Sequence, residues 1–469
     1  MTVEFKEYFT EAAYLVASVL FILGIRDLSS AETARRGNFL AQIGMFLAIV
    51  GTLLNQEIVK FEWIIAGMVI GSLTGAVMAI FMPMTAMPER IAIVNGLGGA
   101  ASCLVGISEY YRHEIDLFVN DPFKMGVVGF EVMLGALTFT GSMIAFGKLR
   151  GLVNSSPVTY KRQNAVNIAW AGLMLALIAC LVYAPSQAVL FYLLLVMAIS
   201  FGVMFVLPIG GADMPVVIAM LNAYSGLAAA ATGFVLDNKV LIIAGALDGS
   251  SGLLLSILMC RAMNRSIVNV LFGAVGQVIR PSGQPAKTSD REPNKITGEE
   301  AAEILARAKS VIVTPGYGMA AAGAQFAVRE LADLLKANGA TVKYAIHPVA
   351  GRMPGHMNVL LADANVPYNE LVEMDDINPQ FPETDVVLVM GANDVVNPAA
   401  RDSEGSPIYG MPILNVDQAK SVIVIKRSMS PGFAGIDNEL FLMPHTHMFF
   451  GDGKAAAEKL VEILKQKET

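Results

Sequence analysis

The segment "VIVTPGYGMAAAGA", Val311 to Ala324, decides the fold of the C-terminal part of the chain. It starts as a short β-branched run, passes through two glycines and then becomes rich in alanine. This order is typical of a buried strand that runs through a tight turn into a helix. Gly316-Tyr317-Gly318-Met319-Ala320-Ala321 fits G-x-G-x-x-A, the pattern of dinucleotide-binding loops. The first glycine is expected to make the turn, the second to admit a pyrophosphate, and Ala321 to pack helix on strand.

Strands and helices alternate after this segment. We predict a helix over Met319–Asn338 and four strands, "SVIVT" (310–314), "TVKYAIH" (341–347), "DVVLVMGA" (385–392) and "SVIVIKR" (421–427). Such alternation predicts an α/β Rossmann-like domain, residues 296–469, with a parallel sheet covered by helices. Ligands are expected at the carboxyl ends of the strands.

The end of the second predicted strand distinguishes between the two nicotinamide nucleotides. An NAD site would place an acidic residue there for the ribose 2′-hydroxyl, but the chain has Tyr344-Ala345-Ile346-His347. Lys426 and Arg427 end the last predicted strand and supply adjacent cations. Two solvated charges at a strand end are the ordinary alternative, but beside a glycine loop they favour the 2′-phosphate of NADP.

The N-terminal half has the composition of a membrane protein. Of the 469 residues, 54% are hydrophobic and 16% charged, against about 25% charged in soluble domains. Residues 1–265 hold 31 charged side chains and the shorter remainder 42, with an acidic excess and no basic face for nucleic acid. We predict a polytopic all-α membrane domain of nine helices: Tyr8–Ile25, Asn38–Leu54, Trp63–Phe81, Ile91–Ile107, Met125–Phe146, Ala165–Tyr183, Ala188–Leu207, Met214–Leu236 and Val240–Cys260.

An odd number of spans puts the two termini on opposite sides of the membrane. With the C-terminal domain in the cytoplasm, eleven Lys and Arg lie inside and five outside, which fits the positive-inside rule. The inside residues are Arg26, Arg35, Arg36, Arg90, Lys148, Arg150, Lys161, Arg162, Arg261, Arg265 and Arg280; the outside ones are Lys6, Lys60, Arg112, Lys124 and Lys239. Residues 266–295, including the polar, proline-rich "RPSGQPAKTSDREPNK", are predicted to be a tether.

Several polar residues interrupt the apolar spans. They are Asn95, Glu131, Asp213, Asn222, Ser225, Asp248, Ser250 and Ser251. Hydrogen bonds between helices are one interpretation of each residue, whereas the cluster from Asp213 to Ser251 favours a proton or ion path. No metal site is expected, because Cys103, Cys180 and Cys260 are far apart and His445-x-His447 has no third ligand nearby.

Together these motifs resemble one family. "TPGYGMA", "HPVAGRMPGHMNVLLA", "MGANDVVNPAA" and "KRSMSPGFAG", with "GGADMPVVIAMLNAYSG" and "GSSG" in the membrane, closely resemble the beta subunit of proton-translocating NAD(P)+ transhydrogenases over essentially the whole chain. The resemblance implies that this chain binds NADP(H) and needs an alpha subunit that binds NAD(H). It also implies a dimer of alpha-beta units in the bacterial inner membrane, with hydride transfer from NADH to NADP+ coupled to inward proton movement.

The resemblance also implies roles for matching residues. NADP(H) would be surrounded by Gly316, Tyr317, Gly318, Met319, Val349, Ala350, Gly351, Arg352, Met353, Pro354, Gly355, Gly391, Ala392, Asn393, Asp394, Val395, Lys426, Arg427, Ser428, Phe433 and Asp452. Asp394 would link nucleotide occupancy to protonation. Asp213, Asn222, Ser250, Ser251 and Gly252 would serve proton transfer and coupling. NADP lies in a reversed orientation in this family, so the glycine loop need not hold the pyrophosphate.

The chain departs from the family pattern at two positions. Asn95 stands where several members carry a histidine proposed as a proton carrier, so the carrier would be Asp248, Glu131 or a group of the alpha subunit. Phe433 replaces a tyrosine of the nucleotide lid. Two other functions remain open: a transporter or channel gated by an NADP-sensing domain, and a membrane-tethered reductase, for which no substrate region follows the fold.

Overall fold

A computed structural model describes residues 3–30, 32–54, 61–112, 121–154, 158–264, 266–267, 270, 292–404, 406, 408–432 and 434–468. The chain forms two compact units, one holding most of residues 1–256 and the other most of residues 257–469. Most of the predicted tether at 266–295 lies outside the described residues. So do Lys60, Arg265, Arg280 and Phe433.

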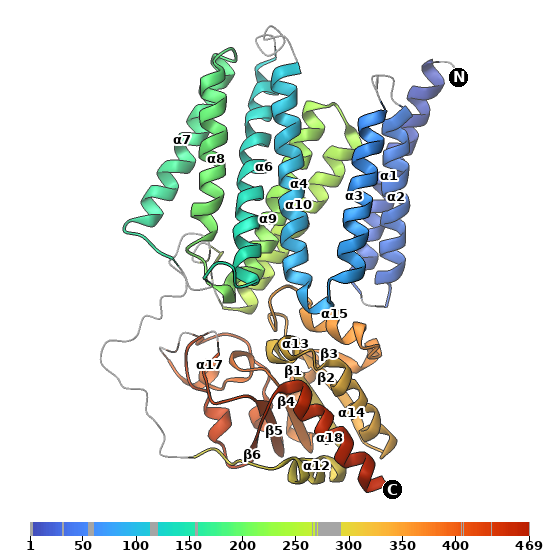
Figure 1. Cartoon of the computed structure of the whole chain (residues 1–469), viewed down its shortest axis with the longest axis vertical. Helices are drawn as coiled ribbons and strands as arrows, with labels where there is room; N and C mark the ends of the chain where they lie inside the picture. The colour runs from blue at the N-terminus through green and yellow to red at the C-terminus, as the bar shows by residue number, and fades with distance from the viewer. Residues whose placement is uncertain are drawn as a thin grey trace. The chain divides into compact units, whose positions relative to one another are not determined.

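The first unit is a bundle of long apolar helices (Figure 1). Within the described residues nine helices are long and apolar enough to cross a membrane, which confirms the nine predicted spans. They are α1 (Val3–Leu28), α2 (Ala34–Leu54), α3 (Glu62–Phe81), α4 (Met87–Arg112), α6 (Pro122–Leu149), α7 (Gln163–Tyr183), α8 (Ala188–Val206), α9 (Met214–Val235) and α10 (Lys239–Ala262).

Helix α9 lies inside the bundle and α3 at its surface. Within its most apolar window 72% of the residues of α9 are buried, whereas none of those of α3 are. Glycines let α10 approach α9 closely. A Cβ atom on Gly245 would lie 2.7 Å from the Gly226 carbonyl oxygen, and one on Gly252 would lie 2.8 Å from the Ala223 nitrogen. Small residues at such crossings let backbones pack directly, as is common between membrane helices.

The second unit contains a six-stranded sheet in the order β3-β2-β1-β4-β5-β6, with every pair parallel. The strands are β1 (Ser310–Pro315), β2 (Thr341–Ile346), β3 (Leu371–Glu373), β4 (Val386–Met390), β5 (Ser421–Lys426) and β6 (Thr446–Phe450). This order reverses between β1 and β4, as in a doubly wound Rossmann fold. The α/β prediction is therefore confirmed.

Both faces of this sheet are covered, so the central strand β4 (VVLVM) is apolar at every residue rather than at alternate ones. In β4, Leu388 packs into a core with the helices α12 (Gly298–Arg307), α14 (Gln325–Ala337) and α18 (Gly453–Glu468). Val387 and Val389 face the opposite core, which includes Ile377 of α16 (Met374–Ile377) and Phe381.

Three details differ from the sequence prediction. The predicted helix over Met319–Asn338 is two helices, α13 (Tyr317–Ala322) and α14, because Gly323 adopts a left-handed φ of +62° between them. Strands β3 and β6 were not predicted. They form the two edges of the sheet.

The tight crossing of α9 and α10 gives a matched pair of substitutions. Gly245→Val would place a branched side chain against the α9 backbone, whereas Gly75→Val on α3 meets no atom within 4 Å. We expect Gly245→Val to destabilise the detergent-solubilised chain by about 1–3 kcal/mol, the usual cost of overpacking. Gly75→Val should change stability little. Thermal denaturation of the two variants checks this, and equal midpoints would contradict the packing described.

Candidate functional site

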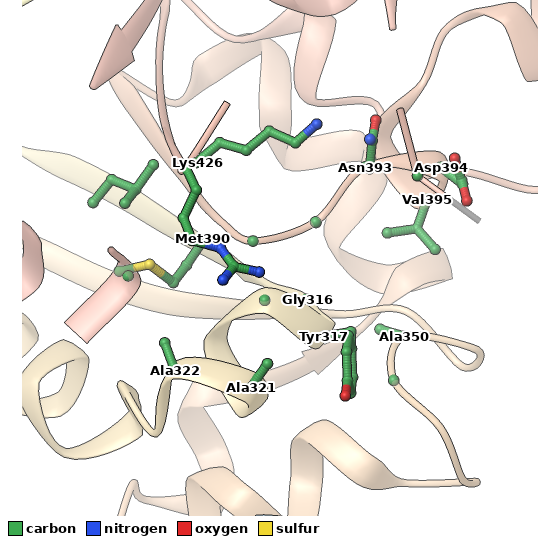
Figure 2. A pocket seen from close by; sticks show the side chains of 18 of the residues that line it. Gly316, Tyr317, Ala321, Ala322, Ala350, Met390, Asn393, Asp394, Val395 and Lys426 are labelled. Carbon is green, nitrogen blue, oxygen red and sulfur yellow. The ribbon is translucent and has the colours of Figure 1, made fainter. Parts of the chain in front are cut away.

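A cavity of about 470 Å³ opens at the carboxyl ends of β1 and β4, where the strand order reverses (Figure 2). This is the place where doubly wound folds bind their ligands, and the volume is in the range of small-molecule sites. The lining comes mainly from the last residues of the strands and the segments that follow them: Gly316, Tyr317, Gly318, Ala321, Ala322, Val349, Ala350, Gly351, Met390, Gly391, Ala392, Asn393, Asp394, Val395, Met411, Ile425, Lys426, Arg427, Ser428, Ser430, Pro431, Gly432, Gly451, Asp452 and Gly453, with Met263 in addition.

The turns after β1 and β4 touch through their glycine backbones. Gly318 donates its N–H to the Gly391 carbonyl at 2.9 Å, and a Cβ on Gly318 would lie 2.7 Å from the Gly391 Cα. Gly391 itself has a φ of +66°, which favours glycine. The missing Cβ of Gly318 is therefore used for contact between turns. The expectation that it admits a pyrophosphate has no support in this geometry.

Two side chains at the end of β4 hold the segment after β5 over the cavity. Asp394 Oδ2 accepts the Ala434 N–H at 3.0 Å. With its amide oxygen turned toward the neighbouring donors, Asn393 accepts the Gly432 N–H at 2.7 Å and Lys426 Nζ at 3.0 Å. Residues 428–432, called the lid below, are thus tied to the turn after β4 by the contact of Asn393 with Gly432, and Asp394 holds Ala434 beyond the lid.

The two predicted cations are placed differently. The Lys426 ammonium reaches toward Asn393 (Figure 2), donates to the Ser430 carbonyl and lies 5.1 Å from the centre of the Phe441 ring. Burial lowers its pKa, and the carboxylates of Asp394 and Asp437 oppose that effect. Arg427 is exposed at the cavity edge. Lys426 is therefore engaged by the lid, while Arg427 faces solvent.

The loop Pro348–Gly355, which follows β2, contributes Val349, Ala350 and Gly351 to the cavity. A buried histidine flanks it on each side. His347 Nδ1 accepts the Val349 N–H at 3.2 Å, and His356 Nδ1 accepts the Arg352 N–H at 2.9 Å. Burial lowers the pKa of His347 to about 4, against the opposing hydrogen bond with the Pro412 carbonyl. Burial and the Arg352 charge lower that of His356 to about 4.

The Arg352 side chain does not line the cavity but points at Tyr317, which does. Its guanidinium carbon lies 4.2 Å from the centre of the Tyr317 ring, a cation–π contact that fixes the ring on the wall of the cavity. Met319 lies in the core beneath the sheet. Five predicted nucleotide contacts are absent from the lining: Met319, Arg352, Met353, Pro354 and Gly355. Phe433 lies outside the described residues.

Asp452 lines the cavity and has a structural task as well. Its Oδ1 accepts the backbone N–H groups of Lys454 and Ala455 at 3.1 and 3.3 Å, which caps the first turn of α18. Gly451 and Gly453 beside it also line the cavity, as does Met390. Sequence reasoning missed these three residues. Recognising β6 would have found the two glycines, because they follow its carboxyl end.

In the membrane unit, predicted path residues meet around α9. Asn222 of α9 donates to Asp248 Oδ1 of α10 at 3.1 Å. Thr232 of α9 donates to Glu131 Oε1 of α6 at 2.6 Å. Asn95 of α4 donates to the carbonyl oxygen of Ile218, also on α9, at 3.3 Å. Three helices thus place polar side chains against a fourth.

The remaining predicted path residues have local positions. Ser250 and Ser251 donate to backbone carbonyls of their own helix, the latter to that of Asp248 at 2.9 Å. Gly252 provides space for α9, and Asp213 ends the turn η2 (Gly211–Asp213) that leads into α9. Among the residues that the structure describes, no group of three or more His, Cys, Asp or Glu could hold a metal ion. His447 Nδ1 instead contacts the Asn294 amide at 2.8 Å.

Comparison with known proteins agrees with the resemblance noted in the sequence. The family model described as NAD(P) transhydrogenase beta subunit matches residues 10–463. A curated protein named NAD(P) transhydrogenase subunit beta, from Rhodospirillum rubrum, is 47% identical over 462 residues. The match covers 97% of this chain and 99% of that relative. A protein of the same name from a specified strain of that species matches equally.

Proposed function

Because this chain belongs to the family of NAD(P) transhydrogenase beta subunits, we propose that it binds NADP(H) in the cavity at the β1–β4 switch point. With an alpha subunit that binds NAD(H), it forms a Re/Si-specific transhydrogenase that moves protons inward as NADH reduces NADP+. The cavity carries this proposal, because it joins a glycine-lined switch point to two adjacent cations, Lys426 and Arg427.

The residues of the cavity fit an anionic dinucleotide. Gly451 after β6 leaves room for a close ligand, since a Cβ there would meet only Ala456 at 3.6 Å, and Arg427 is exposed at the cavity edge, where it can meet a 2′-phosphate from the solvent side. When bound, NADP(H) supplies the nicotinamide that accepts or gives the hydride. The chain needs no general acid or base for this. Its residues orient the ring and exclude water, for which Tyr317 and the lid are placed.

The membrane half supplies the proton path of this proposal. Asn95 cannot titrate, so the carboxyl groups of Glu131 and Asp248 are the candidates for carrying the proton within this chain. Each already has a hydrogen-bond donor on α9, Thr232 for Glu131 and Asn222 for Asp248. Movement of α9 would change both contacts together. Asp213, at the start of α9, is the residue through which that helix would sense nucleotide binding.

The setting follows from the same proposal. The chain lies in the bacterial inner membrane with its C-terminal domain in the cytoplasm, where NADP(H) is available. It pairs with an alpha subunit, and two alpha-beta units associate. The positive-inside distribution of Lys and Arg supports this orientation.

The proposal is tested with vesicles that hold this chain and its alpha subunit. We expect NADH to reduce NADP+ faster when a proton gradient is imposed, and an uncoupler to remove the stimulation. NADP+ binding without any hydride exchange, in a correctly assembled complex, would favour the gated transporter instead. Absence of NADP+ binding would overturn the assignment of the cavity.

The 2′-phosphate assignment predicts a selective loss of affinity. Lys426→Gln and Arg427→Gln should each weaken NADPH binding by about 10- to 100-fold, because a hydrogen bond to a charged group contributes about 1.5–3 kcal/mol. NADH lacks the 2′-phosphate and should lose much less. Lys420→Gln is the control, since Lys420 pairs with Asp385 at 2.8 Å instead. Equal losses for NADPH and NADH would contradict the assignment.

The path around α9 predicts variants that separate binding from pumping. Asn222→Ala removes the donor to Asp248, and Asp213→Asn removes a charge at the start of α9. We expect each to lower gradient-driven NADPH formation by about tenfold or more, because losing a hydrogen bond to a charged group costs about 1.5–3 kcal/mol. The dissociation constant for NADP+ should stay within about twofold of the wild-type value. The matched control is Ser200→Ala, whose hydroxyl bonds only to its own helix at Val196. Normal pumping in both variants would remove Asn222 and Asp213 from the path.

A further inference from the structure

The loop Pro348–Gly355 has a conformation that depends on the two histidines at its ends. His347 and His356 are 2% and 1% exposed, so neither ring exchanges its hydrogen bonds with water. Each uses Nδ1 as the acceptor of a loop N–H, that of Val349 for His347 and that of Arg352 for His356. A nitrogen that accepts a hydrogen bond carries no proton, so both rings are neutral with the proton on Nε2.

The backbone around His356 is shaped to receive its ring. Gly351 has a φ of +111°, and a Cβ at this position would overlap the imidazole. Gly355, directly before the histidine, has a φ of +65° and begins α15 (His356–Asp363). The ring therefore sits inside the curve of the loop, against Gly351 and Arg352, where a charged side chain would be desolvated.

His347 joins the loop to a second segment. Its Nε2 lies 2.8 Å from the Pro412 carbonyl and, as the protonated nitrogen, donates to it. Met411, next to Pro412, also lines the cavity. The imidazole thus joins two segments that contribute to the lining, and its neutral Nε2–H tautomer satisfies both contacts at once.

We propose that His347 and His356 are paired positioning residues, whose neutral rings hold the loop Pro348–Gly355 in its nucleotide-binding conformation and release it on protonation. A protonated imidazole has no acceptor, so the N–H groups of Val349 and Arg352 would lose their partners. The loop would then open the wall formed by Val349, Ala350 and Gly351. This inference rests on the proposed function, since the ligand that the loop would hold is NADP(H).

The charges around the pair set the pH range. In the described structure, Arg352 and the Tyr317 phenol, whose ring centre is 6.5 Å away, are the charged and titratable groups that face His356. Burial and the Pro412 carbonyl, with no charged side chain, set the pKa of His347. A ring with a pKa near 6.5 when released and about 4 when held favours the released loop as pH falls below 6.5. At pH 5.5 this linkage gives up to about a tenfold weaker affinity per histidine.

The test uses the full-length chain in nanodiscs and NADP+ as the probe, with calorimetric titration between pH 8 and pH 5. His356→Asn keeps an acceptor near the Nδ1 position but cannot be protonated, whereas His356→Gln moves its acceptor one bond further out. We expect the Asn variant to bind NADP+ with wild-type affinity at pH 8, within about twofold. As the pH falls, its affinity should decrease up to about tenfold less than that of the wild type. The Gln variant should bind about five- to tenfold more weakly at every pH, the effect of one lost hydrogen bond.

His347→Asn is the second variant. It should remove the part of the pH dependence of NADP+ affinity that comes from protonation of His347. His447→Asn is the matched control, because His447 lies on β6 and contacts Asn294 rather than the loop. The 2′-phosphate of NADP+ titrates in the same range in every variant, so only the difference from the wild type is interpreted. Equal slopes in wild type and His356→Asn would overturn the inference, as would wild-type affinity of His356→Gln at pH 8.

Amide hydrogen exchange keeps the inference separate from the proposed function. Below pH 6.5 the amides of Val349 and Arg352 should lose protection in the wild type and not in the corresponding Asn variants, with or without NADP+. If the wild type does not bind NADP+ at pH 8, the proposed function fails, and the exchange data still decide whether the histidines hold the loop. Unchanged protection in the wild type at pH 5 would overturn the inference even when NADP+ binds.

Discussion

The approach of two glycine backbones at the switch point is the constraint on which the cytoplasmic unit depends. Gly316 and Gly318 after β1 lie so close to Gly391 and Ala392 after β4 that no side chain fits between them. Directly after the touching turns, Asn393 binds Gly432 of the lid and Asp394 binds Ala434 beyond it. A single methyl group at Gly391 would separate the turns and misplace both side chains.

The membrane unit has a comparable centre in α9. Its glycine contacts with α10 bring Asn222 to Asp248, and Thr232 on another part of the helix meets the fully buried Glu131. Polar groups at membrane depth are costly unless they are paired, so these contacts hold helices in register. In the proposed function the carboxyl groups of Glu131 and Asp248 would carry the proton, so helix packing and proton transfer would share one set of hydrogen bonds around α9.

Sequence patterns predicted the elements with strong local signals and missed those without them. The nine spans and strands β1, β4 and β5 are largely apolar runs, and β2 is rich in β-branched and aromatic residues, so their positions follow from composition. Strand β3 has only three residues, and "THMFF" of β6 mixes polar and aromatic residues at an edge, so tertiary pairing defines both. Gly323 looked like an ordinary helical residue because the sequence does not reveal a positive φ.

The same limit applies to the site. The turns that line the cavity follow strand ends, so sequence could predict them, and the family resemblance named most of their residues. Hydrogen bonds between distant segments could not be predicted. Asp394 meets Ala434 forty residues away, and Lys426, which lines the cavity, also contacts Asn393 and the Ser430 carbonyl. His347 and His356 were visible as flanks of a loop, yet their role depends on which ring nitrogen faces the backbone.

The free energy of the hydrogen bonds made by Asn393 and Asp394 is close to the energy that the proposed proton coupling would supply. NAD and NADP are nearly equivalent redox couples, so in the proposed function the drive toward NADPH would come from the proton gradient. One proton crossing about 180 mV supplies about 4 kcal/mol, a bias of about a thousandfold. Ordinary hydrogen bonds contribute about 1 kcal/mol each and charged ones up to about 3. The contact of the Asp394 carboxylate with Ala434 and that of Asn393 with Gly432 together contribute up to about 4 kcal/mol, which is the scale of the energy that one proton supplies.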